Sequence, residues 1–333
     1  MEQNSNSSHP YDALTPEVIL EAVETFGTRC TGAFLALNSY ENRVYRVDRE
    51  DMAPVVAKFY RPQRWSNEQI LEEHSFSQEL TDQEIPVIAP LAHEGATLHT
   101  YKEFRFSLFP WQPGRAPELT GSQDREIIGR YLGRLHNVGA ATPFQYRPTL
   151  DLNSFGRESV QYILENNFLP GYLEEPYSSL TQHLLDHISR DFDAFGMQVH
   201  IRLHGDCHLS NLLWTDTGPH IVDLDDCRMG PAVQDLWMLL SGNRDEAEPQ
   251  LEALLQGYTQ FARFNANELR LIEPLRTLRM LYYSAWLARR WGDPAFPRNF
   301  PWFNTERYWE EQILALREQL ALLDEPPLAW MGY

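Results

Sequence analysis

The chain has 333 residues, a length that predicts two compact domains with enough side chains for a substantial core. Hydrophobic residues make up 43% of it and charged residues 23%, a globular composition that excludes collagen-like, low-complexity and wholly disordered proteins. The 28 Lys and Arg against 47 Asp and Glu give a net charge of −19, so we expect no nucleic-acid partner, because a polyanion is repelled at long range. Any phosphate that binds must be held by local donors or by metal ions.

The number of cysteines and the length of the apolar runs indicate the cellular compartment. Cys30, Cys207 and Cys227 are few and odd in number, which argues against a disulfide framework and favours a reducing compartment. The first residues are polar and acidic and do not resemble a secretory signal. No run of about 18 consecutive apolar residues predicts a membrane-spanning helix. We expect a cytoplasmic, monomeric protein with no membrane partner.

The first third of the chain is predicted to be rich in strands. A helix is expected over 14–26, with Thr15 as its cap and Pro16 at its first position. A second helix is expected from the capping box at Ser66 to about residue 80. Short apolar runs between polar turns predict five strands, over 34–37, 43–47, 55–59, 97–101 and 104–109.

Helical periodicity dominates after the chain breakers at 110–114. Helices are predicted over 125–137, 159–168, 180–195, 232–240, 248–261, 267–291 and 305–323. Two short apolar stretches, 202–214 and 220–224, bracket a turn at 216–218 and predict a β-hairpin within the helical region. We therefore predict a strand-rich domain over 1–111 and a helical domain over 112–333.

The segment LHGDCHLSN, residues 203–211, carries the chemistry. Asp206 and Asn211 stand five positions apart, and Asp223 lies on the strand after the turn. Phosphoryl transfer from a nucleotide needs a carboxylate beside the acceptor hydroxyl and hard oxygen ligands for Mg²⁺. The protein-kinase catalytic loop has the same Asp-to-Asn offset, with a metal-binding Asp on the next hairpin. A loop whose polar groups only cap turns is the plainer interpretation. The apolar strand beside each acidic group argues against it.

Three motifs resemble the aminoglycoside phosphotransferase/choline kinase branch of the protein-kinase-like superfamily. They are H-G-D-x-H-x-x-N-x-L at 204–213, I-V-D-x-D at 221–225, and G-P followed by D-L over 230–236. Within that branch, the chain resembles bacterial cytoplasmic Ser/Thr protein kinases of the stress response. The resemblance implies an α+β fold of two lobes: a small antiparallel sheet with a helix, and a larger helical lobe with a catalytic loop at 203–226. It also implies Mg²⁺-dependent transfer of the ATP γ-phosphoryl group to an alcohol.

Carried over position by position, the resemblance implies roles for the motif residues. Asp206 is the expected proton acceptor for the substrate hydroxyl, and Asn211 and Asp223 are the expected Mg²⁺ ligands. Asp225 is a further candidate, for a second ion. Two other residues are expected to brace the loop without touching substrate, His204 and Asp235.

The strand-rich domain is expected to supply a clamp for the ATP phosphates. Lys58 stands in the apolar run 55–59, and in a kinase-like lobe such a lysine pairs with the phosphates and with a helix glutamate. A solvent-facing lysine on an edge strand is the alternative interpretation. Glu72 and Glu73 compete as its partner, and the helical spacing favours Glu73, which falls on the core-facing arc.

Two further segments are expected to border the nucleotide. The turn at 38–43 lacks the glycines of a protein-kinase phosphate loop, and Ser39 is expected to offer donors to phosphate there. An ordinary hairpin turn has the same kind of sequence. Residues 109–111 are predicted to be the hinge whose backbone meets adenine, with Trp111 equally interpretable as packing.

The acceptor is left open between two classes. The likeness to stress-response kinases favours a protein Ser/Thr acceptor, whereas the wider branch favours a small alcohol of the choline, homoserine or aminoglycoside kind. Only residues 226–229 separate Asp225 from Gly230, which leaves no activation segment and favours a small substrate. A protein that binds ATP without turnover is the third interpretation. The excess of acid suggests a cationic acceptor. Helical spacing predicts that the Trp-, Tyr- and Arg-rich stretch 276–309 is mostly core, with some side chains near the acceptor.

Overall fold

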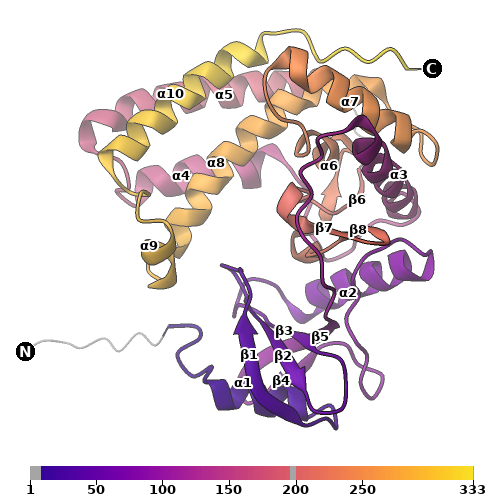
Figure 1. Ribbon diagram of the computed structural model, residues 1–333. Coiled ribbons are helices and arrows are strands. Elements are labelled where there is room, and N and C mark those ends of the chain that lie inside the picture. The colour runs from indigo at the N-terminus through magenta and orange to yellow at the C-terminus, as the bar shows by residue number, and fades with distance from the viewer. Residues whose placement is uncertain (1–8, 196–199, 333) are drawn as a thin grey trace, which may run out of the picture. The chain divides into compact units, whose positions relative to one another are not determined.

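The computed structural model describes residues 9–195 and 200–332 (Figure 1). By its internal contacts the chain forms two compact units. The N-terminal unit comprises Met1–Pro117 and Ser210–Asp225, and the C-terminal unit comprises Glu118–Leu209 and Asp226–Tyr333. The division into domains over 1–111 and 112–333 stays a prediction. The units differ from that prediction in two respects, because residues 112–117 and residues 210–225 both group with the N-terminal part.

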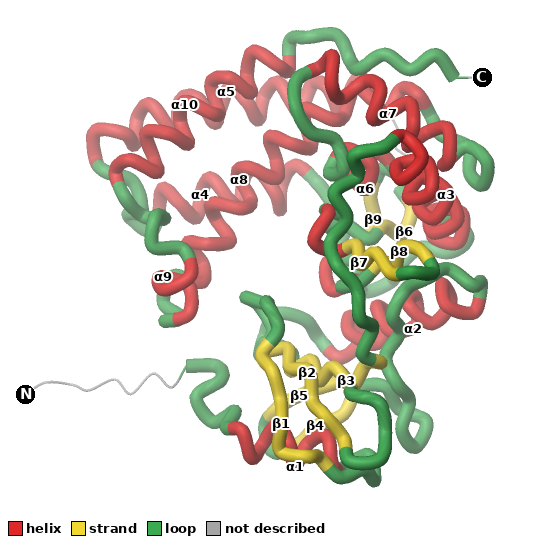
Figure 2. Tube along the Cα trace, viewed as in Figure 1, coloured by secondary structure: helices red, strands yellow, loops and turns green. Residues whose placement is uncertain are grey.

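An antiparallel sheet forms the centre of the N-terminal unit (Figure 2). Its five strands follow the order β1-β2-β3-β5-β4. The strands are β1 (Cys30–Ala36), β2 (Arg43–Arg49), β3 (Val55–Phe59), β4 (His99–Tyr101) and β5 (Phe104–Pro110). All five predicted strands are confirmed, although β1 begins four residues earlier than the sequence indicated. Its pairing with β2 is irregular between Cys30 and Phe34.

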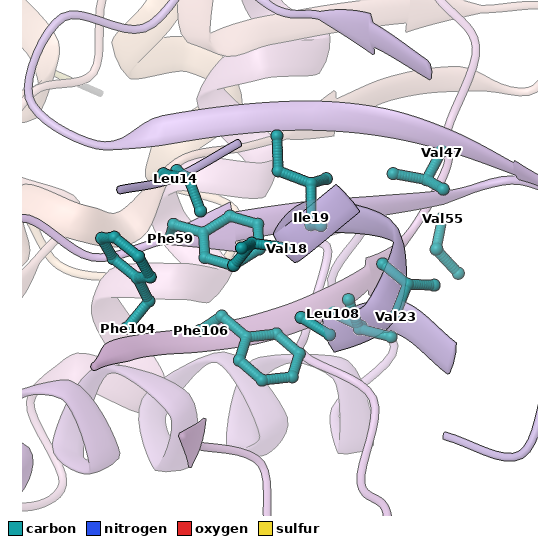
Figure 3. Packing of buried hydrophobic residues seen from close by; sticks show 12 residues of the cluster. Leu14, Val18, Ile19, Val23, Val47, Val55, Phe59, Phe104, Phe106 and Leu108 are labelled. Atoms are coloured by element: carbon teal, nitrogen blue, oxygen red, sulfur yellow. The ribbon is translucent and has the colours of Figure 1, made fainter. Parts of the chain in front are cut away.

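Helix α1 (Pro16–Glu24) packs its apolar side on one face of this sheet (Figure 3). Thr15 caps the helix by accepting a hydrogen bond from the Val18 N–H, as predicted. Ile19 and Val23 of the helix lie among Val47, Phe59 and Phe106 of the strands, all of them buried. Alternate residues of a strand point to opposite faces. The face used by Phe59 is therefore the core face, and Lys58 points to the other.

Helix α2 (Asn67–Asp82) covers that second face. The predicted capping box is confirmed, since Ser66 accepts from the Gln69 N–H and the Gln69 side chain accepts from the Ser66 N–H. The inner side of the helix is buried and includes Ile70, Glu73 and Leu80. Capping and periodicity therefore place the carboxylate of Glu73 on the side of α2 that faces the sheet.

A hairpin from later in the chain completes the N-terminal unit. Strands β7 (Leu212–Thr215) and β8 (Gly218–Ile221) pair with each other. The Trp214 N–H donates to the Arg115 carbonyl at 2.7 Å, and the Ile221 N–H donates to the Pro86 carbonyl at 2.7 Å. These bonds attach both hairpin strands to segments that follow β5 and α2.

The predicted hairpin arm over 202–214 is wrong in its first part. Strand β6 (Ile201–Leu203) pairs with β9 (Arg228–Gly230) in the C-terminal unit. Gly205 has φ +83, a left-handed conformation that ends the strand, and a Cβ there would lie 2.3 Å from the Asp226 carbonyl oxygen. The chain therefore turns after β6, and residues 204–208 form a loop that leads into the short 3₁₀ turn Leu209–Asn211.

The rest of the C-terminal unit is helical. Its α-helices are α3 (Ser122–Gly139), α4 (Glu158–Glu165), α5 (Gly171–Phe195), α6 (Val233–Trp237), α7 (Arg244–Tyr258), α8 (Ile272–Arg290), α9 (Ala295–Asn299) and α10 (Glu306–Leu323). Short turns of other helical type are Asn153–Arg157, Leu209–Asn211, Leu224–Asp226 and Ala266–Leu271. Helix α10 packs along α5, and α4 packs along α8 (Figure 1). No helix within the described ranges is long and apolar enough to cross a membrane.

The two largest differences between observed and predicted helix boundaries are at the starts of α8 and α5, and each helix has a proline near its start. The predicted helix over 267–291 splits into the 3₁₀ turn Ala266–Leu271 and α8, whose first turn contains Pro274. Proline lacks a backbone N–H and is tolerated in the first turn of a helix. Helix α5 begins nine residues before the predicted start at 180, with Pro176 near its beginning.

Helices α3 and α7 touch through their backbones. A Cβ on Gly133 of α3 would lie 2.5 Å from the Tyr258 carbonyl oxygen of α7, and a Cβ on Gly129 would lie 2.0 Å from the Leu254 carbonyl oxygen. Only glycine permits so close an approach. This contact brings Tyr258 beside the inner side of α3.

Candidate functional site

A pocket of about 340 Å³ opens in the N-terminal unit. Part of its lining is apolar, and these residues include Val44, Val56, Phe109, Leu213 and Val222. The polar part of the lining includes Ser39, Lys58, Glu73, Asn211 and Asp223. The pocket thus combines an apolar surface with a small group of charged and amide side chains, as expected of a site for an organic ligand that carries charge.

Lys58 is the only cation among the residues that line this pocket. It is 5% exposed, so the interpretation of a solvent-facing lysine is wrong. Its Nζ lies 2.9 Å from Asp225, 3.2 Å from Asp223 and 3.5 Å from Glu73. Burial alone lowers the pKa of the Lys58 ammonium, but the three carboxylates outweigh burial and hold that pKa well above its usual range. The ammonium is therefore charged whenever the protein is folded at neutral pH.

Asp225 lies buried between two cations. Its carboxylate accepts from Lys58 at 2.9 Å and also from Arg64, at the start of the segment that leads into α2. The resemblance of the I-V-D-x-D motif makes Asp225 a candidate ligand for a second metal ion. In the structure its carboxylate faces an ammonium and a guanidinium, which gives it an ion-pair role that the motif did not indicate.

Asn211 and Asp223 stand at the two ends of the hairpin segment. The Val222 N–H donates to the Asn211 carbonyl at 3.0 Å, which ties the residue before Asp223 to Asn211. Asp223 has φ +62, a left-handed conformation that Asp tolerates better than most residues, and its side chain is exposed to the pocket. An amide oxygen and a carboxylate are hard donors of the kind that Mg²⁺ prefers.

A magnesium ion is implied by the kinase-like resemblance, and the donor set fits it. Mg²⁺ is commonly held by one or two carboxylates or amides, with water and substrate phosphates completing its shell. Asn211 and Asp223 supply that number of ligands. Within the described ranges, no cluster of three or more His, Cys, Asp or Glu side chains could hold a metal ion.

The predicted hinge and phosphate turn both reach the pocket. Ser39 lines it beside Asn38, and Phe109, Pro110 and Trp111 line it from the end of β5. The Trp111 ring also lies 5.3 Å from the Arg46 guanidinium, so its packing role and its place in the lining coexist. What these residues bind stays a prediction.

Asp206 lies in the C-terminal unit, on the loop after β6. The backbone of this loop is held by Asp235, which is fully buried. The Asp235 carboxylate accepts hydrogen bonds from the His204 N–H and the Gly205 N–H at 2.8 Å each. The Asp206 N–H in turn donates to His204 Nδ1 at 3.3 Å. The expected bracing by His204 and Asp235 is confirmed.

A second layer behind Asp235 was not predicted. His136 of α3 lies 3.0 Å from Asp235 through Nε2, and its Nδ1 lies 3.0 Å from the Tyr258 hydroxyl. Burial alone raises the pKa of Asp235, but its hydrogen bonds and the histidines beside it lower that pKa below the usual range. The chain from Tyr258 through His136 to Asp235 links residues 122 and 99 positions apart, and so no local pattern could reveal it.

The Asp206 carboxylate is contacted on both oxygens. Arg279 Nη1 of α8 lies 2.7 Å from Oδ1, and His208 Nε2 lies 3.3 Å from Oδ2. Burial raises the pKa of Asp206, and the His208 hydrogen bond and the Arg279 charge outweigh it, so that pKa lies far below its usual range. Asp206 is therefore ionised at neutral pH. In the sequence, Arg279 stands out only as part of the aromatic and Arg-rich stretch 276–309.

The structure brings part of the predicted site together. Lys58, Glu73 and Asp223 are in direct contact, and Ser39 and Asn211 line the same pocket. The choice of Glu73 over Glu72 agrees with the Lys58 contact. Asp206 belongs to the other unit. The convergence of Asp206 with Asn211 and Asp223 on one phosphate stays a prediction.

Comparison with known proteins identifies the class. Residues 34–272 match the model of the phosphotransferase enzyme family, and the chain belongs to this family. Its fold is the two-lobe, protein-kinase-like fold of α+β class, and the protein is a kinase.

Particular relatives and structures support this assignment. Stress response kinase A of Escherichia coli (strain K12) is 45% identical over 97% of this chain and 98% of that protein. The serine/threonine protein kinase RdoA of Salmonella typhimurium is 44% identical over the same shares. Among solved structures, the amicoumacin kinase hAmiN has a TM-score of 0.73 at 17% identity, with 94% of each chain covered. A microcompartment-associated aminopropanol kinase has a TM-score of 0.69 at 17% identity, covering 92% of this chain and 96% of its own.

Proposed function

We propose that this protein is an ATP- and Mg²⁺-dependent kinase that phosphorylates Ser or Thr residues of proteins during the stress response, as a cytoplasmic monomer. The names of relatives at 45% and 44% identity support the protein acceptor and the stress response. The three cysteines are free thiols, which supports a reducing compartment. Cell fractionation and light scattering on the purified protein test the location and the monomeric state.

The pocket of the N-terminal unit is the observation that carries the proposal. Its apolar lining, with Val44, Val56 and Leu213, suits a flat base, and the nearby hinge residues offer backbone groups to it. Lys58 offers a permanent positive charge to phosphate oxygens. Asn211 and Asp223 would hold the magnesium ion, which supplies charge neutralisation on the phosphates.

Asp206 has the properties that the transfer step requires. An ionised carboxylate accepts a hydrogen bond from the acceptor hydroxyl and takes its proton as the oxygen attacks the γ-phosphorus, while the bond from that phosphorus to the bridging oxygen breaks and ADP leaves. Asp235 holds the backbone N–H groups of His204 and Gly205, so the Asp206 carboxylate is positioned before substrate arrives. Lys58 and Asp223 serve the nucleotide phosphates and not the acceptor. Catalysis therefore consists mainly of positioning the reactants and stabilising the charge on the phosphates.

Transfer of label from [γ-³²P]ATP tests this function. We expect wild-type protein with Mg²⁺ to label casein or histone, and Asp206→Asn to reduce the rate by about 10²–10⁴-fold. Nucleotide binding, followed with a fluorescent ATP analogue, should be unchanged in that variant. Asp216→Asn, an exposed aspartate in the β7–β8 turn, is the matched control and should keep the wild-type rate. Wild-type labelling by Asp206→Asn would exclude the proposed base.

A small-alcohol kinase is the second candidate, and one observation favours it. Only a short segment joins Asp225 to β9, because β9 begins at Arg228, so the chain has no activation segment of the protein-kinase kind there. Solved structures with this fold include kinases named for amicoumacin and aminopropanol. Label that appears only in an added amino alcohol or amino sugar, and never in protein, would favour this candidate.

A further inference from the structure

The acceptor side of Asp206 is bordered by an arginine. Arg279 contacts Oδ1 of Asp206 at 2.7 Å through Nη1, and its side chain remains 36% exposed. A guanidinium has five N–H donors in a rigid fork. Within residues 9–195 and 200–332, the Asp206 contact is the one ion pair found for Arg279. Donors on its other edge therefore face outward beside the carboxylate that is proposed to receive the acceptor hydroxyl.

The helix that carries Arg279 differs in charge from the protein as a whole. The chain has a net charge of −19, whereas α8 (Ile272–Arg290) contains four arginines and a single acid, Glu273. Arg276 lies one turn before Arg279 on the same side of the helix and is 35% exposed, with its guanidinium 3.2 Å from the Glu273 carboxylate and 5.2 Å from the Trp237 ring. Helix α8 thus carries an excess of arginine on an acidic protein, and its one acid, Glu273, is paired with Arg276.

We propose that Arg279 selects acceptors that carry a carboxylate close to the hydroxyl to be phosphorylated, that is, a Ser or Thr flanked by Asp or Glu. This inference rests on the proposed function, because it takes Asp206 as the group that receives the acceptor hydroxyl. Arg279 bridges Asp206 and the acceptor carboxylate, and so it acts as a specificity residue. It binds the flanking acid and holds the hydroxyl beside Asp206 at the same time.

An acceptor flanked by acidic residues is the opposite of the cationic acceptor that the net charge suggests. The overall field of the protein attracts cations, but an ammonium group placed beside Arg279 is repelled at short range. A charge-assisted pair between a guanidinium and a carboxylate is directional and stronger than a neutral hydrogen bond. The long-range field of the protein repels an acidic segment. A preference for such segments would therefore be explained only by the local arrangement around Asp206.

Binding of two matched peptides tests the proposal without requiring transfer. Both peptides are fluorescently labelled and carry Ala in place of Ser; one is flanked by Glu and the other by Arg, and anisotropy is measured at one ionic strength. We expect wild-type protein to bind the Glu peptide at least about tenfold tighter than the Arg peptide. Arg279→Gln should weaken binding of the Glu peptide by about tenfold or more and leave the Arg peptide no weaker.

Two further variants separate charge recognition from folding. Arg279→Lys keeps a cation and should keep a preference for the Glu peptide. Arg307→Gln changes an exposed arginine of α10 that is 85% exposed, and it should bind both peptides like wild type. Equal weakening of both peptides in Arg279→Gln, or a wild-type preference for the Arg peptide, would overturn the proposal.

The Ser versions of the same peptides separate this inference from the proposed function. If they are phosphorylated with no preference for the Glu peptide, the role of Arg279 is wrong and the kinase proposal stands. If the Ala peptides show the expected preference and no Ser peptide is phosphorylated, the protein-kinase proposal fails and the anion-binding role of Arg279 stands.

Discussion

Lys58 is one of only two lysines in the chain, which has 26 arginines. The other is Lys102, which is exposed and pairs with Glu21. A compact ammonium fits among the carboxylates of Glu73, Asp223 and Asp225, where the planar fork of arginine needs a different geometry. The rarity of lysine also makes Lys58 chemically addressable, since a lysine-directed nucleotide probe has a single competing target.

We expect Lys58→Met to lose function and stability together. Removing the cation takes a charged partner away from the buried Asp225 carboxylate, and breaking a buried ion pair in this way costs about 3–5 kcal/mol. Phosphotransfer should fall by at least about a hundredfold. The measurements are the urea midpoint and the rate of ³²P transfer. Lys102→Met is the matched control, and a similar loss in that variant would show that the effect is not specific to the pocket.

Asp235→Asn gives a prediction that depends on pH. Asn presents an NH₂ group to the His204 and Gly205 N–H donors, and we expect a loss of about 3–5 kcal/mol at neutral pH. The pKa of Asp235 is lowered in the folded state, so its stabilisation is complete above the usual Asp pKa of about 4 and declines as pH falls through the native pKa.

Urea unfolding of wild type and Asp235→Asn between pH 7 and pH 3 checks this sign. The difference between the two free energies of unfolding should be constant near neutrality and should narrow below about pH 4. Asp216→Asn, in an exposed turn, should track the wild type throughout. A difference that widens in acid would contradict the assigned direction.

The residues found from sequence share one property. Asp206, Asn211, Asp223 and Lys58 stand in short patterns whose spacing carries the chemistry, and Glu73 follows from helical periodicity. The arginines at the site, Arg64 and Arg279, were not assigned there. Each meets its aspartate across more than 70 positions of sequence, a contact that only tertiary structure creates.

At the scale of elements, capping signals located helix starts well. Thr15 and Ser66 cap α1 and α2 as predicted, and Thr305 caps α10. The short pairing of β6 with β9 was missed, because a strand as short as Ile201–Leu203 has no clear alternation and its partner lies 25 residues later.

The backbone contact between α3 and α7 leads to a further prediction. Gly133→Ala should destabilise the protein by about 1–3 kcal/mol, because its Cβ must displace the backbone at Tyr258. That shift also disturbs the hydrogen bond from Tyr258 to His136 behind the catalytic loop, so kcat should fall while KM for ATP is unchanged. Thermal unfolding and steady-state kinetics measure the two effects.

Gly171→Ala provides the control within a helix. A Cβ at Gly171, the first residue of α5, meets no atom within 4 Å. This substitution should be neutral or stabilise by up to about 1 kcal/mol. Equal stability of Gly133→Ala and wild type would show that α3 and α7 separate without cost, contrary to the close contact described.

At the scale of the whole molecule, the N-terminal unit is discontinuous in sequence. The β7–β8 hairpin is joined to residues 1–117 through the Arg115–Trp214 and Pro86–Ile221 bonds. A fragment of residues 1–117 therefore lacks part of its own structure, including the carboxylates of Asp223 and Asp225 that neutralise Lys58. We expect this fragment to be unfolded or loosely packed in solution.

A fusion of residues 1–117 to 210–225 through a short Gly/Ser linker is the informative comparison. Gly114 and Leu213 are in contact, so the two ends lie within reach of such a linker. The fusion should give a dispersed ¹⁵N–¹H NMR spectrum, and the fragment of residues 1–117 should give a collapsed one. Equal dispersion for both would show that the hairpin is dispensable for folding.

The same discontinuity sets an order of events on the ribosome. The 92 residues of Glu118–Leu209 are synthesised between the two pieces of the N-terminal unit. At typical elongation rates, this interval lasts roughly 5 to 20 s. During that interval the nascent sheet contains Lys58, but its partners Asp223 and Asp225 have not yet been synthesised. Slow codons or chaperones that act on this stretch of the message would therefore influence how much active kinase a cell obtains.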